Sequence, residues 1–225
     1  MARLHRNTVR SVYDRLLAAY GPQHWWPADT SFEVLVGAVL TQNAAWTNVE
    51  YALGHLRDAD ALDSEAILAL DDGRLGALIR PSGYFNVKAR RLKALCRHVV
   101  DAGGLDALAA KDTPALRRDL LAVNGIGRET ADDIVLYAFH RPVFVIDAYT
   151  RRIFARLGKI DGNEGYEDLR QSFERAVGPD VDTCQEYHGL LVEHAKQACN
   201  VRPRCSECAL RRRCPVGRGE HAVHS

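Results

Sequence analysis

The sequence has no apolar run long enough to cross a bilayer. Its longest aliphatic stretch, Val34 to Leu40, contains a glycine and falls far short of the roughly 20 residues that a membrane-spanning helix needs. The first ten residues carry three arginines, and no apolar segment follows them, so they do not form a secretory signal. We therefore expect no membrane span and a cytoplasmic location.

The sequence also lacks an excess of one charge. Its 225 residues include 30 basic and 29 acidic side chains, so total charge does not single out a nucleic-acid-binding protein. The basic residues are unevenly placed, however. Six lysines and arginines and no acid fall in residues 80–97, and seven against one glutamate fall in residues 196–218. Both patches could face phosphates, although a single basic patch is more often a solvated helix face.

Alternation of apolar and polar residues, the pattern of a half-buried strand, is missing as well. The β-branched segment 143–146 is too short to form a sheet. Apolar residues at helical spacing predict helices over residues 9–20, 32–40 continuing into 45–56, 62–70, 73–79 and 87–100. Thr113 followed by Pro114 predicts an N-cap with proline at the first helical position. We therefore expect an all-α protein.

Six cysteines are present, and four of them follow a C-x5-C-x2-C-x5-C pattern within 16 residues. Without an export signal disulfides are not expected, so four thiolates at this spacing point to Zn²⁺ or a [4Fe–4S] cluster. One CxxC pair instead of the two of a zinc ribbon favours iron–sulfur. The four candidate ligands are Cys199, Cys205, Cys208 and Cys214. We interpret Cys96 and Cys184 as small buried apolar residues.

The cysteine segment is largely polar and cannot bury much of a core, so metal ligation would stabilise it instead. Arg202 and Arg204 lie between the first two cysteines. A rigid loop that presents arginines is suited to a phosphate backbone.

A second informative segment is Asn124-Gly125-Ile126-Gly127, which connects two apolar helical stretches. Glycines allow a tight turn, and the N–H groups that open the second helix attract an anion. Such a helix-hairpin-helix can grip a DNA phosphate, although many helical proteins use a similar turn only to reverse direction.

Asp147 ends the apolar run 143–146 and precedes a further helical stretch. The simplest interpretation is an N-cap. A carboxylate beside a dry apolar wall could instead stabilise a developing oxocarbenium ion at a sugar C1′ and orient water for attack.

Together, the hairpin, Asp147 and the four cysteines resemble the endonuclease III branch of the helix-hairpin-helix DNA glycosylases. The resemblance implies a two-domain α fold: a six-helix barrel with the hairpin over residues 25–134, and a second domain of residues 1–24 plus 135–225 with a [4Fe–4S] cluster. It also implies a monomer that binds duplex DNA with a damaged base, at the nucleoid, and flips the target nucleotide for glycosidic cleavage. Asp147 stands at the position of the family's essential aspartate. The first cysteine gap is one residue shorter than is usual in endonuclease III.

Further positions follow from the same resemblance. Gln42 and Asn43 match the segment that fills the gap left by the flipped base, and Tyr84 replaces the family's apolar wedge. The residues implied to contact DNA are Gln42, Asn43, Tyr84, Asn124, Gly125, Ile126, Gly127, Arg128, Thr130, Arg202 and Arg204. The alternative for Tyr84 is a half-buried loop residue.

Glu129 is the main departure from the family pattern. Bifunctional endonuclease III enzymes have a lysine at this position, whose amine forms a Schiff base and permits strand cleavage. A carboxylate cannot form an imine, and a glutamate in a first helical turn also complements the helix dipole. We therefore expect a monofunctional glycosylase, with Asp147 and Glu129 as candidate catalytic residues. The alternatives are a bifunctional enzyme that uses another lysine, such as Lys88 or Lys159, and a catalytically silent DNA-binding protein.

The segments 41–50 and 80–86 also resemble a subgroup that includes 3-methyladenine glycosylases. Trp46 could stack on an electron-poor alkylated purine, or it could be a core tryptophan. The choice between oxidised pyrimidines and alkylated purines therefore stays open. A zinc-dependent transcription factor is a third, weaker interpretation of the cysteine pattern.

Overall fold

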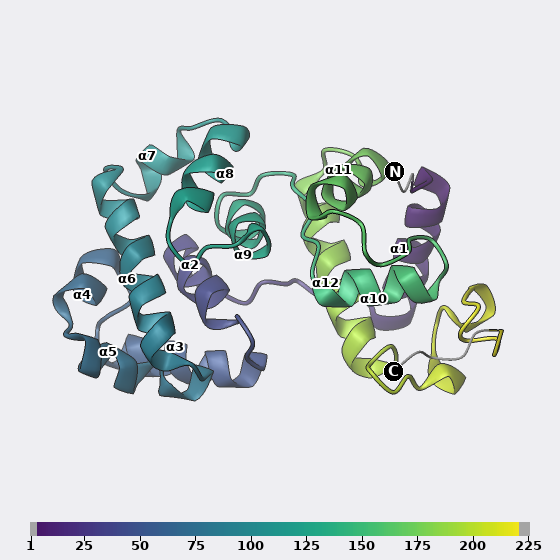
Figure 1. Cartoon of the computed structure of the whole chain (residues 1–225), viewed down its shortest axis with the longest axis horizontal. Helices are drawn as coiled ribbons and strands as arrows, with labels where there is room; N and C mark the ends of the chain where they lie inside the picture. Colours follow the sequence, from purple (N-terminus) through teal and green to yellow (C-terminus); the bar gives the residue numbers. More distant parts are fainter. Residues whose placement is uncertain (1–3, 221–225) are drawn as a thin grey trace. The chain divides into compact units, whose positions relative to one another are not determined.

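A computed structural model describes residues 4–220, and every regular element within that range is helical (Figure 1). The all-α prediction is confirmed. Residues 143–146 are buried and extended, but they are assigned to no strand. None of the helices in this range combines the length and apolar character needed to span a bilayer.

The chain divides into two compact units, described separately below. Unit 1 consists of Met1–Pro27 and Pro142–Ser225, and unit 2 is the continuous segment Ala28–Arg141.

Unit 2 contains most of the helices. They are α2 (Ser31–Leu40), α3 (Trp46–Asp58), α4 (Ser64–Ala69), α5 (Asp72–Leu78), the 3₁₀ turn η1 (Arg80–Ser82), α6 (Phe85–Asp101), α7 (Leu105–Ala109), α8 (Thr113–Ala122), α9 (Arg128–Asp133) and the π-helical turn η2 (Ile134–Ala138).

Helix α2 forms the centre of unit 2. All of its residues after Ser31 are buried, as expected for a helix that is apolar on every side. It contacts η2, α3, α6 and α9, while the long helix α6 packs against α4 and α5. The predicted continuation of this helix into the next is interrupted between Leu40 and Trp46, where Asn43 adopts a left-handed φ of 52°.

The hairpin is formed by α8 and α9. Asp112, not Thr113, caps α8, because its side chain accepts a hydrogen bond from the N–H of Ala115. The sequence interpretation was therefore wrong by one residue: the aspartate is the stronger cap, and Thr113 and Pro114 form the first turn. Gly125 has a φ of +86° in the turn, and Gly127 is the N-cap residue of α9.

Unit 1 contains α1 (Arg6–Tyr20), α10 (Ala148–Arg156), α11 (Tyr166–Val177), α12 (Val181–Gln197) and the 3₁₀ turns η3 (Cys205–Glu207) and η4 (Arg211–Arg213). Helix α1 packs against α11 and α12, and α10 against α12. Phe144, Phe154, Phe173 and Tyr187 form its buried aromatic core; the rings of Phe144 and Phe173 stack with centroids 4.6 Å apart. This core supports the extended segment that leads to Asp147.

Candidate functional site

Asp147 is a buried carboxylate at the N-terminus of α10. Asp147 is only 7% exposed, and its Oδ1 accepts a hydrogen bond of 2.6 Å from the backbone N–H of Thr150. The N-cap expectation is confirmed. The four residues that precede Asp147 in the chain, Val143 to Ile146, are all apolar and buried.

A histidine from α12 faces this carboxylate. The Nε2 atom of His188, itself buried, lies 3.6 Å from Oδ2 of Asp147. Burial by itself would raise the pKa of Asp147, but the neighbouring His188 and the donors of Thr150 outweigh it, so the pKa is lowered below its usual value. The carboxyl group is therefore held as an anion although it is shielded from water. The 41-residue separation of this pair gives no sequence signal that could have predicted it.

In unit 2, the side chain of Gln42 is tied to the hairpin. Its Nε2 donates to the carbonyl of Gly125 at 3.1 Å and to Oγ1 of Thr130 at 3.0 Å. Its Oε1 accepts from Nη1 of Arg91 at 2.5 Å. Arg91 also covers the turn, since a Cβ at Gly125 would lie 2.2 Å from its Cγ. The structure thus brings Gln42, Gly125 and Thr130 together, with Arg91 as a partner that the sequence analysis missed.

Other predicted positions of unit 2 are exposed. Tyr84 is 72% exposed in a left-handed conformation with a φ of 48°, which excludes the half-buried alternative. Asn43 is exposed too. Within the hairpin, Ile126 and Thr130 are buried. Its exposed residues are Asn124, Gly127, Arg128 and Glu129.

Lys88, one of the two lysines considered as a substitute nucleophile, is buried in α6. Its Nζ donates to the carbonyls of Leu40 at 2.8 Å and Ser82 at 2.6 Å. Lys159, the other one, is exposed in unit 1.

The four predicted ligands lie in the cysteine segment at the end of unit 1. Cys199 and Cys214 are buried and Cys205 and Cys208 are partly exposed. Burial raises the pKa of Cys208, and the three other cysteines of the segment raise it further. The isolated cysteines, Cys96 and Cys184, are buried as expected.

Two basic side chains approach these thiols. Nη1 of Arg156 lies 3.3 Å from Sγ of Cys199, and Nε2 of His194 lies 3.7 Å from Sγ of Cys208. Among residues 4–220, no three histidine, cysteine or carboxylate side chains are arranged to hold a single metal ion. A [4Fe–4S] cluster has a different requirement, because each of its cysteines binds a separate iron. Arg202 and Arg204 are exposed on the same loop.

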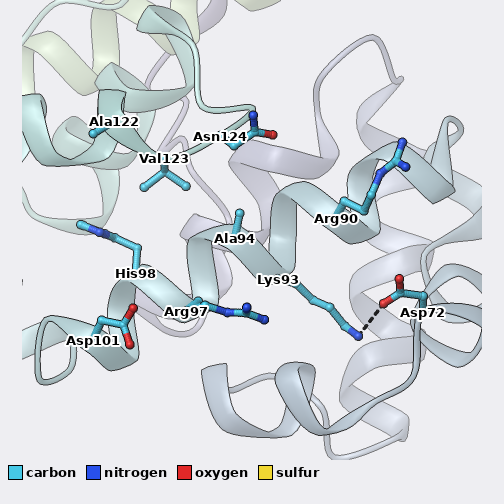
Figure 2. A pocket seen from close by; sticks show the side chains of 10 residues that line it. All are labelled: Asp72, Arg90, Lys93, Ala94, Arg97, His98, Asp101, Ala122, Val123 and Asn124. Carbon is cyan, nitrogen blue, oxygen red and sulfur yellow. Dashed lines mark hydrogen bonds and ion pairs between the residues drawn. The ribbon is translucent and has the colours of Figure 1, made fainter.

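A basic groove of about 600 Å³ runs along α6 beside the hairpin. Figure 2 shows Arg90, Lys93 and Arg97 projecting from α6, with Asn124 of the hairpin above them. Asp72 neutralises Lys93 through an ion pair of 2.6 Å. Arg90 and Arg97 are exposed and lie two helical turns apart, on one face of α6. The basic segment noted in the sequence therefore lines a groove.

Comparisons with known proteins show which family the chain belongs to. Residues 36–179 match the family model of the HhH-GPD superfamily of base excision DNA repair proteins. A protein of Methanocaldococcus jannaschii named as a candidate DNA repair glycosylase, MJ1434, is 44% identical over 209 residues, covering 92% of this chain and 95% of the relative.

Two solved structures are also similar. The H. pylori 3-methyladenine DNA glycosylase MagIII, bound to 1,N6-ethenoadenine, has a TM-score of 0.71 at 31% identity, covering 85% of this chain and 95% of its own. A non-covalent endonuclease III–DNA complex has a TM-score of 0.82 at 22% identity, covering 96% and 98%. The chain therefore belongs to the HhH-GPD superfamily of base excision DNA repair proteins, as an endonuclease III-like DNA glycosylase.

Proposed function

We propose that the protein is a monofunctional DNA N-glycosylase, which flips a damaged base out of duplex DNA and hydrolyses its N-glycosidic bond with water. The observation that carries this proposal is the buried, anionic carboxylate of Asp147. It occupies the position of the essential aspartate in the family that the sequence resembles.

Asp147 suits the chemistry of glycosidic cleavage. As the base leaves, positive charge develops on the sugar, and a carboxylate held in a site with little water stabilises that charge more strongly than an exposed one. The hydrogen bond from Thr150 and the contact with His188 keep the group ionised and oriented. In this role Asp147 lowers the barrier electrostatically and orients the attacking water.

The residues of unit 2 would bind and deform the duplex. The exposed hairpin residues would hold a phosphate at the N-terminus of α9. Arg202 and Arg204, which are exposed in unit 1, would make separate contacts to the DNA backbone. Tyr84 would enter the base stack, while Gln42 and Asn43 would fill the space left by the flipped base. The similarity to endonuclease III solved with DNA supports this role for the fold. We propose that the protein acts as a monomer on duplex DNA.

The absence of strand scission follows from Glu129. By the resemblance, residue 129 corresponds to the lysine nucleophile of bifunctional relatives, and a carboxylate there cannot form a Schiff base. Lys88 is not a convincing substitute, since both hydrogen bonds of its buried Nζ go to backbone carbonyls. Lys159 is exposed in unit 1, where it lines a small cavity with Arg212, Arg213 and Arg218, far along the chain from the hairpin position that carries the lysine in bifunctional relatives.

We further propose that Cys199, Cys205, Cys208 and Cys214 hold a [4Fe–4S] cluster. The guanidinium of Arg156 beside Cys199 fits a thiolate ligand, because its positive charge can offset the charge of the sulfur. The bound cluster would tie together a segment with little apolar core and so hold Arg202 and Arg204 in place. Iron and sulfide analysis with visible charge-transfer absorbance tests this, and zinc without sulfide would refute it.

The experiment that tests the proposed reaction is a panel of duplexes with oxidised, alkylated or deaminated bases, resolved with and without alkali. A monofunctional glycosylase gives strand breaks only after alkali. The panel includes both 3-methyladenine and ethenoadenine, because the similar MagIII structure is a 3-methyladenine glycosylase bound to the latter base. Robust borohydride trapping of the unmodified protein would contradict the monofunctional assignment, and binding without release of any base would support a silent DNA-binding protein.

A further inference from the structure

Lys88 is an unusual lysine, because its ammonium group is buried and has no acidic partner. The residue is only 2% exposed, and no carboxylate in residues 4–220 lies within ion-pair distance of it. Its Nζ donates instead to two backbone carbonyls, that of Leu40 at 2.8 Å and that of Ser82 at 2.6 Å. Burying a charged group costs free energy unless its hydrogen-bond partners replace the lost hydration. The two carbonyl groups must therefore stabilise the buried ammonium group.

Both carbonyls belong to helix ends. Leu40 is the last residue of α2, and Ser82 is the last residue of η1. Carbonyl groups at the end of a helix accept no hydrogen bond from their own helix, and they lie at the negative end of the helix dipole. They are therefore suitable partners for a buried cation. Burial is the main cause that lowers the pKa of Lys88 to about 8, and the positive charge of Arg91 lowers it further. At this pKa the ammonium group is still mostly protonated at neutral pH.

The two helix ends lead directly into the segments expected to enter the base stack. Gln42 and Asn43 follow Leu40, and Tyr84 follows Ser82 after a single glycine. Gly83 and Tyr84 both have positive φ values, 70° and 48°, and the Tyr84 side chain is exposed. A single nitrogen atom thus bridges the anchor points of both segments. Gln42 is in turn fixed to the hairpin through Gly125 and Thr130.

We propose that Lys88 is a positioning residue, which keeps Tyr84 and the Gln42–Asn43 segment at a fixed separation so that both enter the base stack together when a nucleotide is flipped. This inference rests on the proposed function. It assigns Lys88 no contact with the reacting atoms. The contribution of Lys88 lies in the step that separates the target base from its neighbours.

The test compares Lys88→Met, which keeps an unbranched apolar side chain but removes the ammonium group with its donors, with Lys111→Met. Lys111 is a matched control in unit 2, where it pairs with Asp119 away from these segments. The first readout is the fluorescence of 2-aminopurine placed opposite an abasic-site analogue, which reports disturbance of the stack without any glycosidic cleavage. Because this signal needs no catalysis, it tests Lys88 even if no lesion in the panel is cleaved and the proposed reaction fails.

The second readout is the single-turnover rate on a paired lesion and on the same lesion left unpaired. Stacking on one base contributes about 1–3 kcal/mol, which corresponds to roughly a 5- to 150-fold effect, and we expect the rate of Lys88→Met on the paired lesion to fall within that range. On the unpaired lesion, which is easily flipped, the loss should shrink to about threefold or less. A general structural defect would instead lower both rates equally, and that result would overturn the proposal.

A double-mutant cycle with Tyr84→Ala tests the route of the effect. If Lys88 acts partly through Tyr84 and partly through the Gln42–Asn43 segment, Lys88→Met should cost clearly less rate and fluorescence in the Tyr84→Ala background than in the unmodified protein. Additive effects would contradict the proposal. Lys88→Gln keeps an uncharged NH₂ donor group and replaces Lys88→Met if the latter does not fold; if neither variant folds, Lys88 serves the scaffold and the proposal is wrong.

Discussion

Replacing Glu129 with lysine should convert the protein into a trappable lyase at a small cost in stability. Glu129 is exposed in the first turn of α9, where its negative charge complements the helix N-terminus. Removing that interaction and adding a positive charge each cost about 0.3–1 kcal/mol, so the exchange should cost about 1–2 kcal/mol. For a protein of 225 residues this is a decrease of roughly 2–8 °C in the melting temperature.

The assay is borohydride reduction in the presence of a duplex that contains an aldehydic abasic site. The Glu129→Lys variant should form a covalent adduct, because its amine can attack C1′ and the resulting imine can be reduced. Glu129→Gln is the control, since it removes the charge without supplying an amine. If Glu129→Lys binds and distorts the duplex but is never trapped, residue 129 does not reach the sugar. Equal trapping of the unmodified protein and the variant would show that another amine is the nucleophile.

Three further changes test packing and charge within unit 2. The combined Arg90→Ala and Arg97→Ala variant should bind duplex DNA with a less steep dependence of log affinity on log salt concentration. The slope should fall by about one unit for each lost phosphate contact, and an unchanged slope would exclude the groove from the interface. Gly125→Ala should lower the melting temperature and weaken DNA binding, since the position has a φ of +86° and no room for a Cβ; wild-type behaviour would contradict this geometry. Asp132→Asn should reduce the free energy of unfolding in urea by about 3–5 kcal/mol, because it breaks the buried pair with Arg117 whose atoms lie 2.6 Å apart; a loss below about 1 kcal/mol would count against a buried, desolvated pair.

Features that depend on neighbouring residues in the chain were accessible from the sequence. The helical periodicity of residues 9–20 corresponds to α1, and the carboxylate of Asp147 caps α10 as expected. The apolar surroundings of Cys96 and Cys184 also followed from their lack of partners in the sequence. In each case local spacing or composition determines the outcome.

Features that depend on contacts between distant segments were not accessible. Lys88 looks like one more member of a basic stretch, and only the fold shows that it is buried against the carbonyls of Leu40 and Ser82. Likewise, the contact of His188 with Asp147 joins residues 41 positions apart. Neither a helical nor an alternating pattern encodes such pairs, because tertiary packing alone brings them together.

The most direct test of the account is the single-turnover rate of base release by Asp147→Asn on a lesion that the unmodified protein cleaves. Asparagine keeps the size of the side chain and an oxygen that can accept from the Thr150 N–H, so the variant should fold and bind an abasic-site analogue normally. Because it loses the negative charge, its rate should fall by about 100- to 1000-fold. A rate within about threefold of the unmodified protein would contradict the central role of the Asp147 carboxylate.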